Sequence, residues 1–208
     1  MLINIMKTKR FFIFIIFILC SFVSPLYANY DKAIKLYNLK QYKKSVIAFK
    51  NFILSDNPNE TKKKDAMYNL AVIYDFGLGV PKDKSRAFEW YIKASKLNHD
   101  IAQFNLAWIY YNGDNVEKNN FEAFRYYSLS AEQGYSKAQF NLASLYYSGE
   151  GTMKDYVNAY KWFKISSLNG IVESQKFINK IKKIIHPEEL ISANNLIDKW
   201  LKKYENKN

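Results

Sequence analysis

One six-residue motif recurs in this chain at a fixed spacing of 36 residues. It is Ala-Met-Tyr-Asn-Leu-Ala from Ala66, and Ala-Gln-Phe-Asn-Leu-Ala from both Ala102 and Ala138. A fixed period of this size is typical of helical arrays, in which each repeat is one supersecondary unit. Because neither helix of such a unit can bury its apolar face alone, neighbouring repeats must stack. The period therefore constrains the fold more than any other feature of the sequence.

Each repeat is predicted to hold two helices, with a turn after each. Apolar residues at i, i+3 and i+4, such as Leu70, Ile73 and Tyr74, indicate the first helix. Glycine can take the left-handed conformation that ends a helix, so we expect caps at Gly77, Gly113 and Gly149. The second helix is expected to start after the capping residues Asp83, Asn119 and Asp155. It is expected to end at Asn98, Gly134 and Gly170.

The composition agrees with a packed helical protein. Of the 208 residues, 49% are hydrophobic, including 17 Tyr and 15 Phe, which is enough apolar surface for a core. Gly and Pro are few, at 7 and 4, so long disordered stretches are not expected. No useful length of sequence alternates between polar and apolar residues as a strand does. The sequence predicts an all-α fold.

The repeated residues also resemble the Sel-1-like repeat family. The shared string is Ala-x-x-x-Leu-(Gly/Ala)-x-x-Tyr-x-x-Gly-x-Gly-Val, then Lys-Asp, Ala, Trp-Tyr and Lys-Ala, between Ala66 and Glu173. That family is a branch of the tetratricopeptide-like arrays, so the resemblance implies a right-handed α-solenoid of helix-turn-helix repeats. The chain departs from the pattern where alanine replaces the usual glycine, at Ala71, Ala107 and Ala143. We expect these changes to alter local packing and to leave the fold intact.

The remaining segments complete the expected organisation. In the carboxyl-terminal part, some apolar residues keep the helical spacing of the repeats, but lysines take many of the other positions. A solvated outer face of this kind is expected of the cap of an array. The expected divisions are a signal peptide at 1–28, an N-terminal tetratricopeptide-like hairpin at 29–58, a linker and helix start at 59–65, Sel-1-like repeats at 66–101, 102–137 and 138–173, and C-terminal capping helices at 174–208.

The first 28 residues have the layout of a secretory signal peptide. Three basic residues, the last of them Arg10, precede the uncharged apolar run 11–23, and small residues follow. Cleavage is expected between Ala28 and Asn29. The alternative is an uncleaved anchor, although the apolar run is short for a span of about 20 residues. We therefore expect an exported protein, periplasmic or secreted, with no stable membrane span after cleavage.

The sequence contains no recognisable catalytic constellation. His99 and His186 are not in a metal-ligand spacing, and the single cysteine, Cys20, lies in the predicted signal peptide. No serine has a lysine three positions later, as a Ser-x-x-Lys nucleophile requires. We predict no enzymatic activity and no cofactor or metal. Some cysteine-rich members of the family that this chain resembles are linked to penicillin binding or β-lactam hydrolysis. An envelope enzyme or antibiotic-binding protein is therefore the alternative function.

The chain is basic, with a formal charge of +12 from 31 Lys and Arg against 19 Asp and Glu. Its lysines are dispersed along helix faces and the carboxyl end, where a solvated surface explains them. That distribution, with the expected export, argues against a nucleic-acid partner. The charge favours an anionic envelope surface or an acidic protein partner.

The resemblance further implies a binding surface for a protein or peptide. In tetratricopeptide-like arrays the first helix of each repeat lines the concave side. Carried over by register, the candidate peptide groove consists of Tyr68, Asn69, Asp75, Phe104, Asn105, Trp108, Tyr111, Phe140, Asn141 and Tyr147. Primary amides both donate and accept hydrogen bonds, which suits an extended peptide backbone. Aromatic rings give the flat contact area that is common in binding hot spots.

An alternative for the same residues is structural. The asparagines would then bond only to neighbouring helix ends, and the aromatic rings would belong to the core. Trp108 is the best candidate for binding, because Val72 and Ser144 occupy its position in the other repeats. Those smaller residues indicate that folding does not require a bulky side chain there. The predicted function is an exported, non-enzymatic scaffold that binds proteins or peptides.

Overall fold

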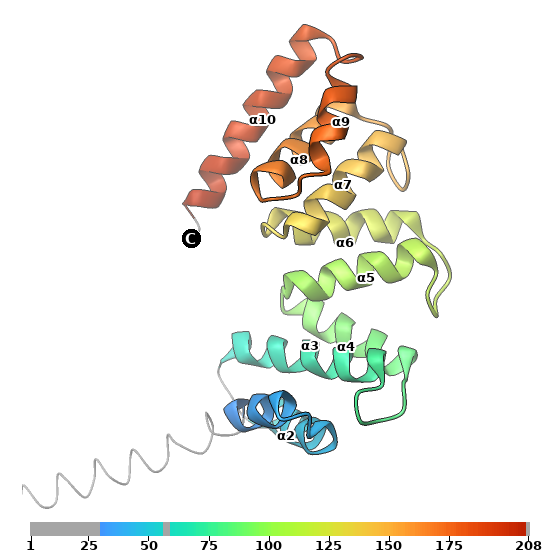
Figure 1. The fold of residues 1–208 in the computed structure, drawn as a ribbon, viewed down its shortest axis with the longest axis vertical. Coiled ribbons are helices and arrows are strands. Elements are labelled where there is room, and N and C mark those ends of the chain that lie inside the picture. Colours follow the sequence, from blue (N-terminus) through green and yellow to red (C-terminus); the bar gives the residue numbers. More distant parts are fainter. Residues whose placement is uncertain (1–29, 56–58, 207–208) are drawn as a thin grey trace, which may run out of the picture. The chain divides into compact units, whose positions relative to one another are not determined.

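The computed structural model describes residues 30–55 and 59–206 and is built from helices (Figure 1). These residues contain no strand, which confirms the predicted all-α class. The predicted signal peptide and its cleavage site between Ala28 and Asn29 lie outside them. Among the helices of the described ranges, none has both the length and the apolar character needed to cross a membrane.

The described helices follow one another with short connections. After a helical segment at 30–38, they are α2 (Tyr42–Leu54), α3 (Glu60–Phe76), α4 (Lys84–Lys96), α5 (Asp100–Asn112), α6 (Asn120–Glu132), α7 (Ser136–Ser148), α8 (Tyr156–Leu168), α9 (Ser174–Ile181) and α10 (Pro187–Glu205). The chain divides into two compact units, 1–90 and 91–208, and the division falls within α4.

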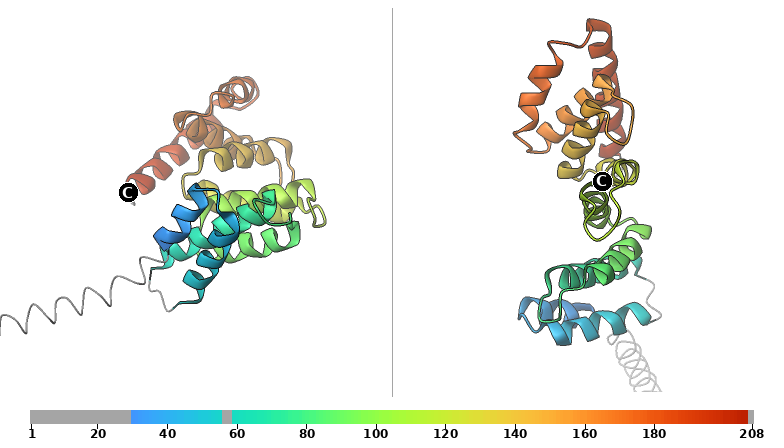
Figure 2. Two further views of the ribbon diagram at one scale, coloured as in Figure 1. Left: turned by 60° about the horizontal axis from the view of Figure 1, so that its bottom comes forward. Right: turned by 90° about the vertical axis from the view of Figure 1, so that its right-hand side faces the viewer.

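In the first unit, the segment 30–38 and α2 form a helical hairpin that packs against α3 (Figure 2). The Ser45 hydroxyl donates to the Ala33 carbonyl at 2.9 Å and joins the two arms of the hairpin. The Tyr30 ring lies 5.3 Å from that of Phe52, centroid to centroid. The next helix, α3, begins at Glu60, where the Asn59 side chain accepts from the Lys62 amide. It therefore includes most of the polar segment before the first repeated motif.

In the second unit, α5 with α6 and α7 with α8 form two hairpins that are 36 residues apart in the sequence. Helix α6 packs against α7, α8 packs against α9, and α10 returns along α8 (Figures 1 and 2). Fully buried alanines allow close helix contacts at Ala102, Ala123, Ala138 and Ala159. Most of each apolar helix face is thus covered by its neighbours, as the period predicted, while Phe121 and Leu129 of α6 stay exposed.

The helix ends confirm the predicted caps. Gly77, Gly113 and Gly149 close α3, α5 and α7 in the left-handed region, with φ of 66°, 70° and 80°. At the starts of the second helices, the side chains of Asp83, Asn119 and Asp155 accept from backbone amides three residues on. These local bonds satisfy groups that a helix cannot pair itself.

Candidate functional site

A pocket of about 250 Å³ lies where α5, α6 and α7 meet. We call it the Trp108 pocket. Its lining residues are Trp108, Tyr111 and Asn112 from α5, Tyr127 from α6, and Asn141, Ser144 and Leu145 from α7. Three members of the predicted groove, Trp108, Tyr111 and Asn141, are therefore brought together in one place.

The pocket depends on a difference between two equivalent positions. Trp108 and Ser144 are 36 residues apart and hold the same place in α5 and α7. Trp108 is 46% exposed, so nearly half of the residue is available to a ligand. The small side chain of Ser144 leaves space across from it and donates to the Phe140 carbonyl at 3.1 Å. A large ring opposite a small residue creates the hollow.

Tyr127 and Asn141 form the buried end of the pocket. Tyr127 is 2% exposed, and burial raises its pKa to about 12, while the hydrogen bond from the Asn141 side chain opposes that rise. The phenol is therefore neutral at physiological pH and lies beside the Asn141 side chain. An amide beside an exposed indole can pair with a backbone group of a bound peptide.

Tyr111 lies at the charged edge of the pocket. Burial, and then its hydrogen bond with Glu150, raises the pKa of the Tyr111 phenol. On the other side, the Lys118 ammonium lies 5.1 Å from the ring centroid. The edge therefore carries both a carboxylate and an ammonium group, which can engage polar parts of a ligand.

Three predicted aromatic residues outside the pocket pack on aromatic rings of other segments of the second unit. The Phe104 ring lies 5.1 Å from that of Tyr135, and the Phe140 ring lies 5.5 Å from that of Phe163. Tyr147 contacts Phe177 at 5.7 Å between ring centroids. These half-buried rings hold helices together, which is the structural alternative. Asn105 is half-buried on α5.

The predicted residues of the first unit have local partners. The Asn69 amide donates to the Asp65 carbonyl at 2.8 Å, within its own helix, and Asp75 pairs with Lys84 at 2.8 Å. Tyr68 is half-buried on α3. The asparagines at one register position therefore bond differently, Asn69 to its own helix and Asn141 to Tyr127. The ten-residue groove stays a prediction.

Sequence reasoning missed Tyr127, because only first helices were considered for the groove. A signal was present: Tyr127 occupies the position that Phe163 holds one repeat later. A buried tyrosine usually needs a partner for its hydroxyl, whereas phenylalanine does not. That difference points to a polar neighbour such as Asn141.

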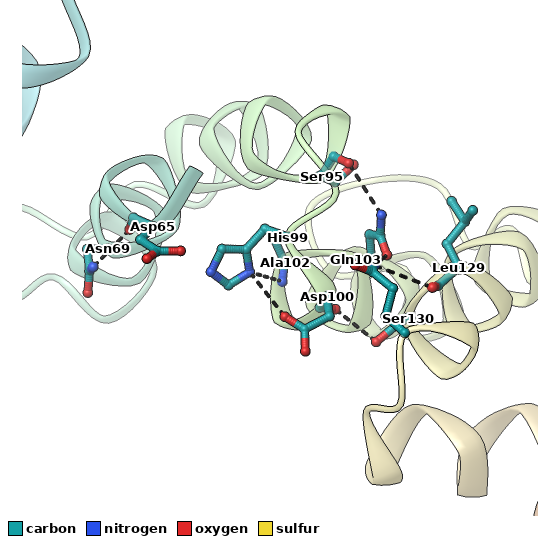
Figure 3. A network of polar contacts seen from close by, with 10 residues as sticks. Asp65, Asn69, Ser95, His99, Asp100, Ala102, Gln103, Leu129 and Ser130 are labelled. Atoms are coloured by element: carbon teal, nitrogen blue, oxygen red, sulfur yellow. Dashed lines mark hydrogen bonds and ion pairs between the residues drawn. The ribbon is translucent and has the colours of Figure 1, made fainter. Parts of the chain in front are cut away.

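A second missed feature is a pair of buried glutamines. Gln103 donates to the Ser95 carbonyl at 3.3 Å (Figure 3). It also accepts from the Gln133 amide at 2.6 Å. One repeat later, Gln139 donates to the Ala131 carbonyl at 3.3 Å and accepts from Asn169 at 2.8 Å. Each glutamine thus joins the end of the preceding helix to the end of the following one.

The buried histidine of this region is a helix cap. His99 precedes α5, and its Nδ1 accepts from the Ala102 amide at 3.2 Å (Figure 3). That bond requires a lone pair on Nδ1, so the proton of the neutral ring is on Nε2. Asp100 lies 3.8 Å from the same nitrogen and could pair with it only after protonation. Capping explains why a histidine occurs here.

The repeats identify the family. A family model described as the Sel1 repeat matches residues 23–39, 64–99, 100–135 and 136–171, which is more than half of the chain. The chain belongs to the Sel1-repeat family. Two solved structures are similar to this Sel1-repeat protein. A Sel1 repeat protein from Oxalobacter formigenes is 32% identical, with a TM-score of 0.63, over 71% of this chain and 58% of that one.

The other is a protective antigen with an SLR fold, present in uropathogenic Escherichia coli strains. It is 24% identical, with a TM-score of 0.54, over 90% of this chain and 48% of its own, and this likeness concerns the fold alone. The present Sel1-repeat chain spans about half the length of these two relatives. No curated protein matches it.

Proposed function

We propose that this Sel1-repeat protein is an exported, non-enzymatic scaffold of the cell envelope that binds an extended peptide segment of a partner protein. The Trp108 pocket is the observation that carries the proposal. It combines an exposed indole with the Asn141 amide beside a buried phenol and with a charged edge. An exposed aromatic anchor beside oriented polar groups is the usual composition of a binding hot spot.

Export is proposed from the sequence of the first 28 residues. Mass spectrometry of the protein recovered from its native cells should give Asn29 as the first residue. Recovery of chains that begin at Met1 in the membrane fraction would contradict cleavage, and the anchor would then be the better interpretation.

Peptide binding can be tested through Trp108. A library of displayed peptides is selected on the protein, and the affinity of the selected peptides is compared between the parent and Trp108→Ala. We expect a loss of about 2 kcal/mol or more in binding free energy, as at other aromatic hot spots. The melting temperature should hardly change, because much of the ring is exposed.

Met153→Ala is the matched control for this experiment. Met153 is a large exposed apolar residue that does not line the pocket. Its removal should leave the affinity of the selected peptides unchanged. Equal losses in both variants, or selected peptides that ignore Trp108, would contradict the proposed site.

A further inference from the structure

A second pocket, of about 600 Å³, lies along α6 and shares no residue with the Trp108 pocket. We call it the α6 pocket. Its apolar lining includes Phe121, Phe124 and Leu129, and its charged lining is Arg125 and Glu132. Phe121 and Leu129 are exposed, Leu129 by 41%. Apolar side chains gathered in an exposed hollow are typical of interaction sites.

The same surface one repeat later is already covered. Leu129 corresponds to Ile165, which has no exposure, and Phe124 corresponds to Tyr160, which is also buried. Helices α6 and α8 each pack against the helix before and the helix after them. The difference is α10, which lies along α8 (Figure 1). The chain therefore contains its own example of a helix that fills this surface.

The contacts near the end of α10 show what such a helix needs. The Trp200 indole donates to the Glu132 carboxylate at 3.2 Å, and the Lys203 ammonium lies 3.7 Å from the same group. Tyr204 packs on Gly134, where any Cβ would collide with its ring. An acidic residue and a glycine thus accept a basic, aromatic helix.

One repeat earlier, the acidic residue and the glycine that accept α10 are both replaced. The equivalent of Glu132 is Lys96, and the equivalent of Gly134 is Asn98, which lines the α6 pocket. A helix like α10 would bring Lys203 against Lys96 and Tyr204 against the larger Asn98. The α6 pocket therefore does not suit α10 of a second copy.

We propose that the α6 pocket binds an amphipathic helix of a partner protein, with acidic residues where α10 carries lysine. Apolar residues of that helix would cover Phe121 and Leu129, as α10 covers α8. Its acidic residues would face Lys96, and a small residue would pass Asn98. This is helix-in-groove recognition, with the charge pattern setting the choice of partner.

The probes for a test are peptides made from residues 187–205. One has the sequence of α10, and the other carries Lys202→Glu, Lys203→Glu and Tyr204→Ala. Each labelled peptide is titrated with the protein, and binding is followed by fluorescence anisotropy. We expect the acidic peptide to bind at least about tenfold more tightly than the basic one, a difference of about 1.4 kcal/mol. In the Lys96→Glu protein, the order of the two peptides should reverse.

Two further variants locate the binding. Leu129→Ala and Phe121→Ala should each weaken binding of the acidic peptide at least about tenfold. Leu168→Ala removes an exposed leucine at the end of α8, outside the pocket, and should leave binding unchanged. All three residues are exposed, so circular dichroism should show the same fold in every variant.

Three results would overturn the proposal. The first is no detectable binding of the acidic peptide. The second is binding that Leu129→Ala and Phe121→Ala do not weaken, as would happen if the peptide displaced α10 from α8. The third is self-association of the protein that Leu129→Ala abolishes, because the pocket would then belong to a second copy.

Discussion

Helices α6 and α8 hold the same place in consecutive repeats, yet their surroundings differ. Leu129 on α6 is exposed, whereas Ile165 on α8 is fully buried, because α10 covers α8. Equivalent positions in a repeat protein therefore need not have equivalent burial. An added helix can convert part of a repeat surface into core, and the next surface along remains available for a partner.

The largest expected effect is the loss of the anchor that holds α10 on α8. Trp200 is nearly buried, stacks on Tyr204 at 4.8 Å and contacts Trp162 at 5.8 Å between ring centroids. Trp200→Ala should lower the free energy of unfolding by about 3–5 kcal/mol, the usual cost of removing a buried aromatic ring. The measurement is chemical denaturation followed by circular dichroism.

Leu129→Ala on α6 is the matched change in the uncovered region. Because Leu129 is exposed, its removal should cost less than about 1 kcal/mol of unfolding free energy. If Trp200→Ala and Leu129→Ala lowered the free energy of unfolding by similar amounts, the proposed difference between a covered α8 and an uncovered α6 would be wrong.

The next effect concerns alkaline pH and separates Tyr127 from its equivalent, Phe163. The ordinary pKa of tyrosine is 10, and burial raises that of Tyr127 to about 12 in the folded protein. The folded state thus keeps this proton while the unfolded state releases it. The contribution of this phenol to the free energy of unfolding is complete below pH 10. It is lost as the pH rises through 12, by up to about 2.7 kcal/mol.

Tyr127→Phe should therefore reduce the loss of stability between pH 10 and pH 12. Tyr30, whose pKa is also raised to about 12, contributes its own loss in both proteins. The reverse change, Phe163→Tyr, should destabilise by about 1–3 kcal/mol at neutral pH, since the residue equivalent to Asn141 is Phe177 and offers no hydrogen bond. Alkaline denaturation curves that coincide for Tyr127→Phe and the parent would argue against the burial of this phenol.

A smaller effect should separate two glycines with the same backbone conformation. Gly134 and Gly170 have φ of 98° and 92°, so alanine strains the backbone at both. A Cβ at Gly134 would also collide with Tyr204 of α10, whereas nothing lies within 4 Å of one at Gly170. Gly134→Ala should cost about 1–3 kcal/mol more than Gly170→Ala, as overpacking does. Equal thermal melts would show that α10 does not press on Gly134.

The smallest effect is expected at the glutamines. Gln103→Met copies the first repeat, where Met67 stands at this position, and Gln139→Met makes the same change on α7. Each removes hydrogen bonds whose net value is about 0.5–1.5 kcal/mol apiece. Urea denaturation measures the loss of unfolding free energy in each variant. Losses of similar size would show that the hydrogen bonds of Gln103 and Gln139 contribute equally, although only Gln139 lies beside α8, the helix that α10 covers.

Much of the fold could be predicted because its signals are local. The period, the glycines with positive φ and the capping carboxylates and amides act within a few residues of where they stand. The C-terminal capping helices were also predicted, within 174–208. The sequence does not show which helix α10 covers, because α10 contacts Glu132 and Gly134, which are distant from it in the sequence.

The candidate site was predictable only in part. Trp108 was identified because smaller residues replace it in the other repeats, and a residue the fold does not require is free to bind. Phe104 and Phe140 could not be distinguished from core residues, since the same helical spacing serves both purposes. The proposed signal peptide and export stay predictions, because they concern residues outside the described ranges.

The buried glutamines also affect how the chain assembles. Gln103 bonds to the last turn of α4 on one side and to the end of α6 on the other. If the α5 hairpin folded without docking on the end of α4, this side chain would be buried without the Ser95 carbonyl, at a cost of about 1–3 kcal/mol. Gln139 stands in the same relation to the Ala131 carbonyl of α6. One amide in each of two successive hairpins therefore couples the folding of that hairpin to the helix before it.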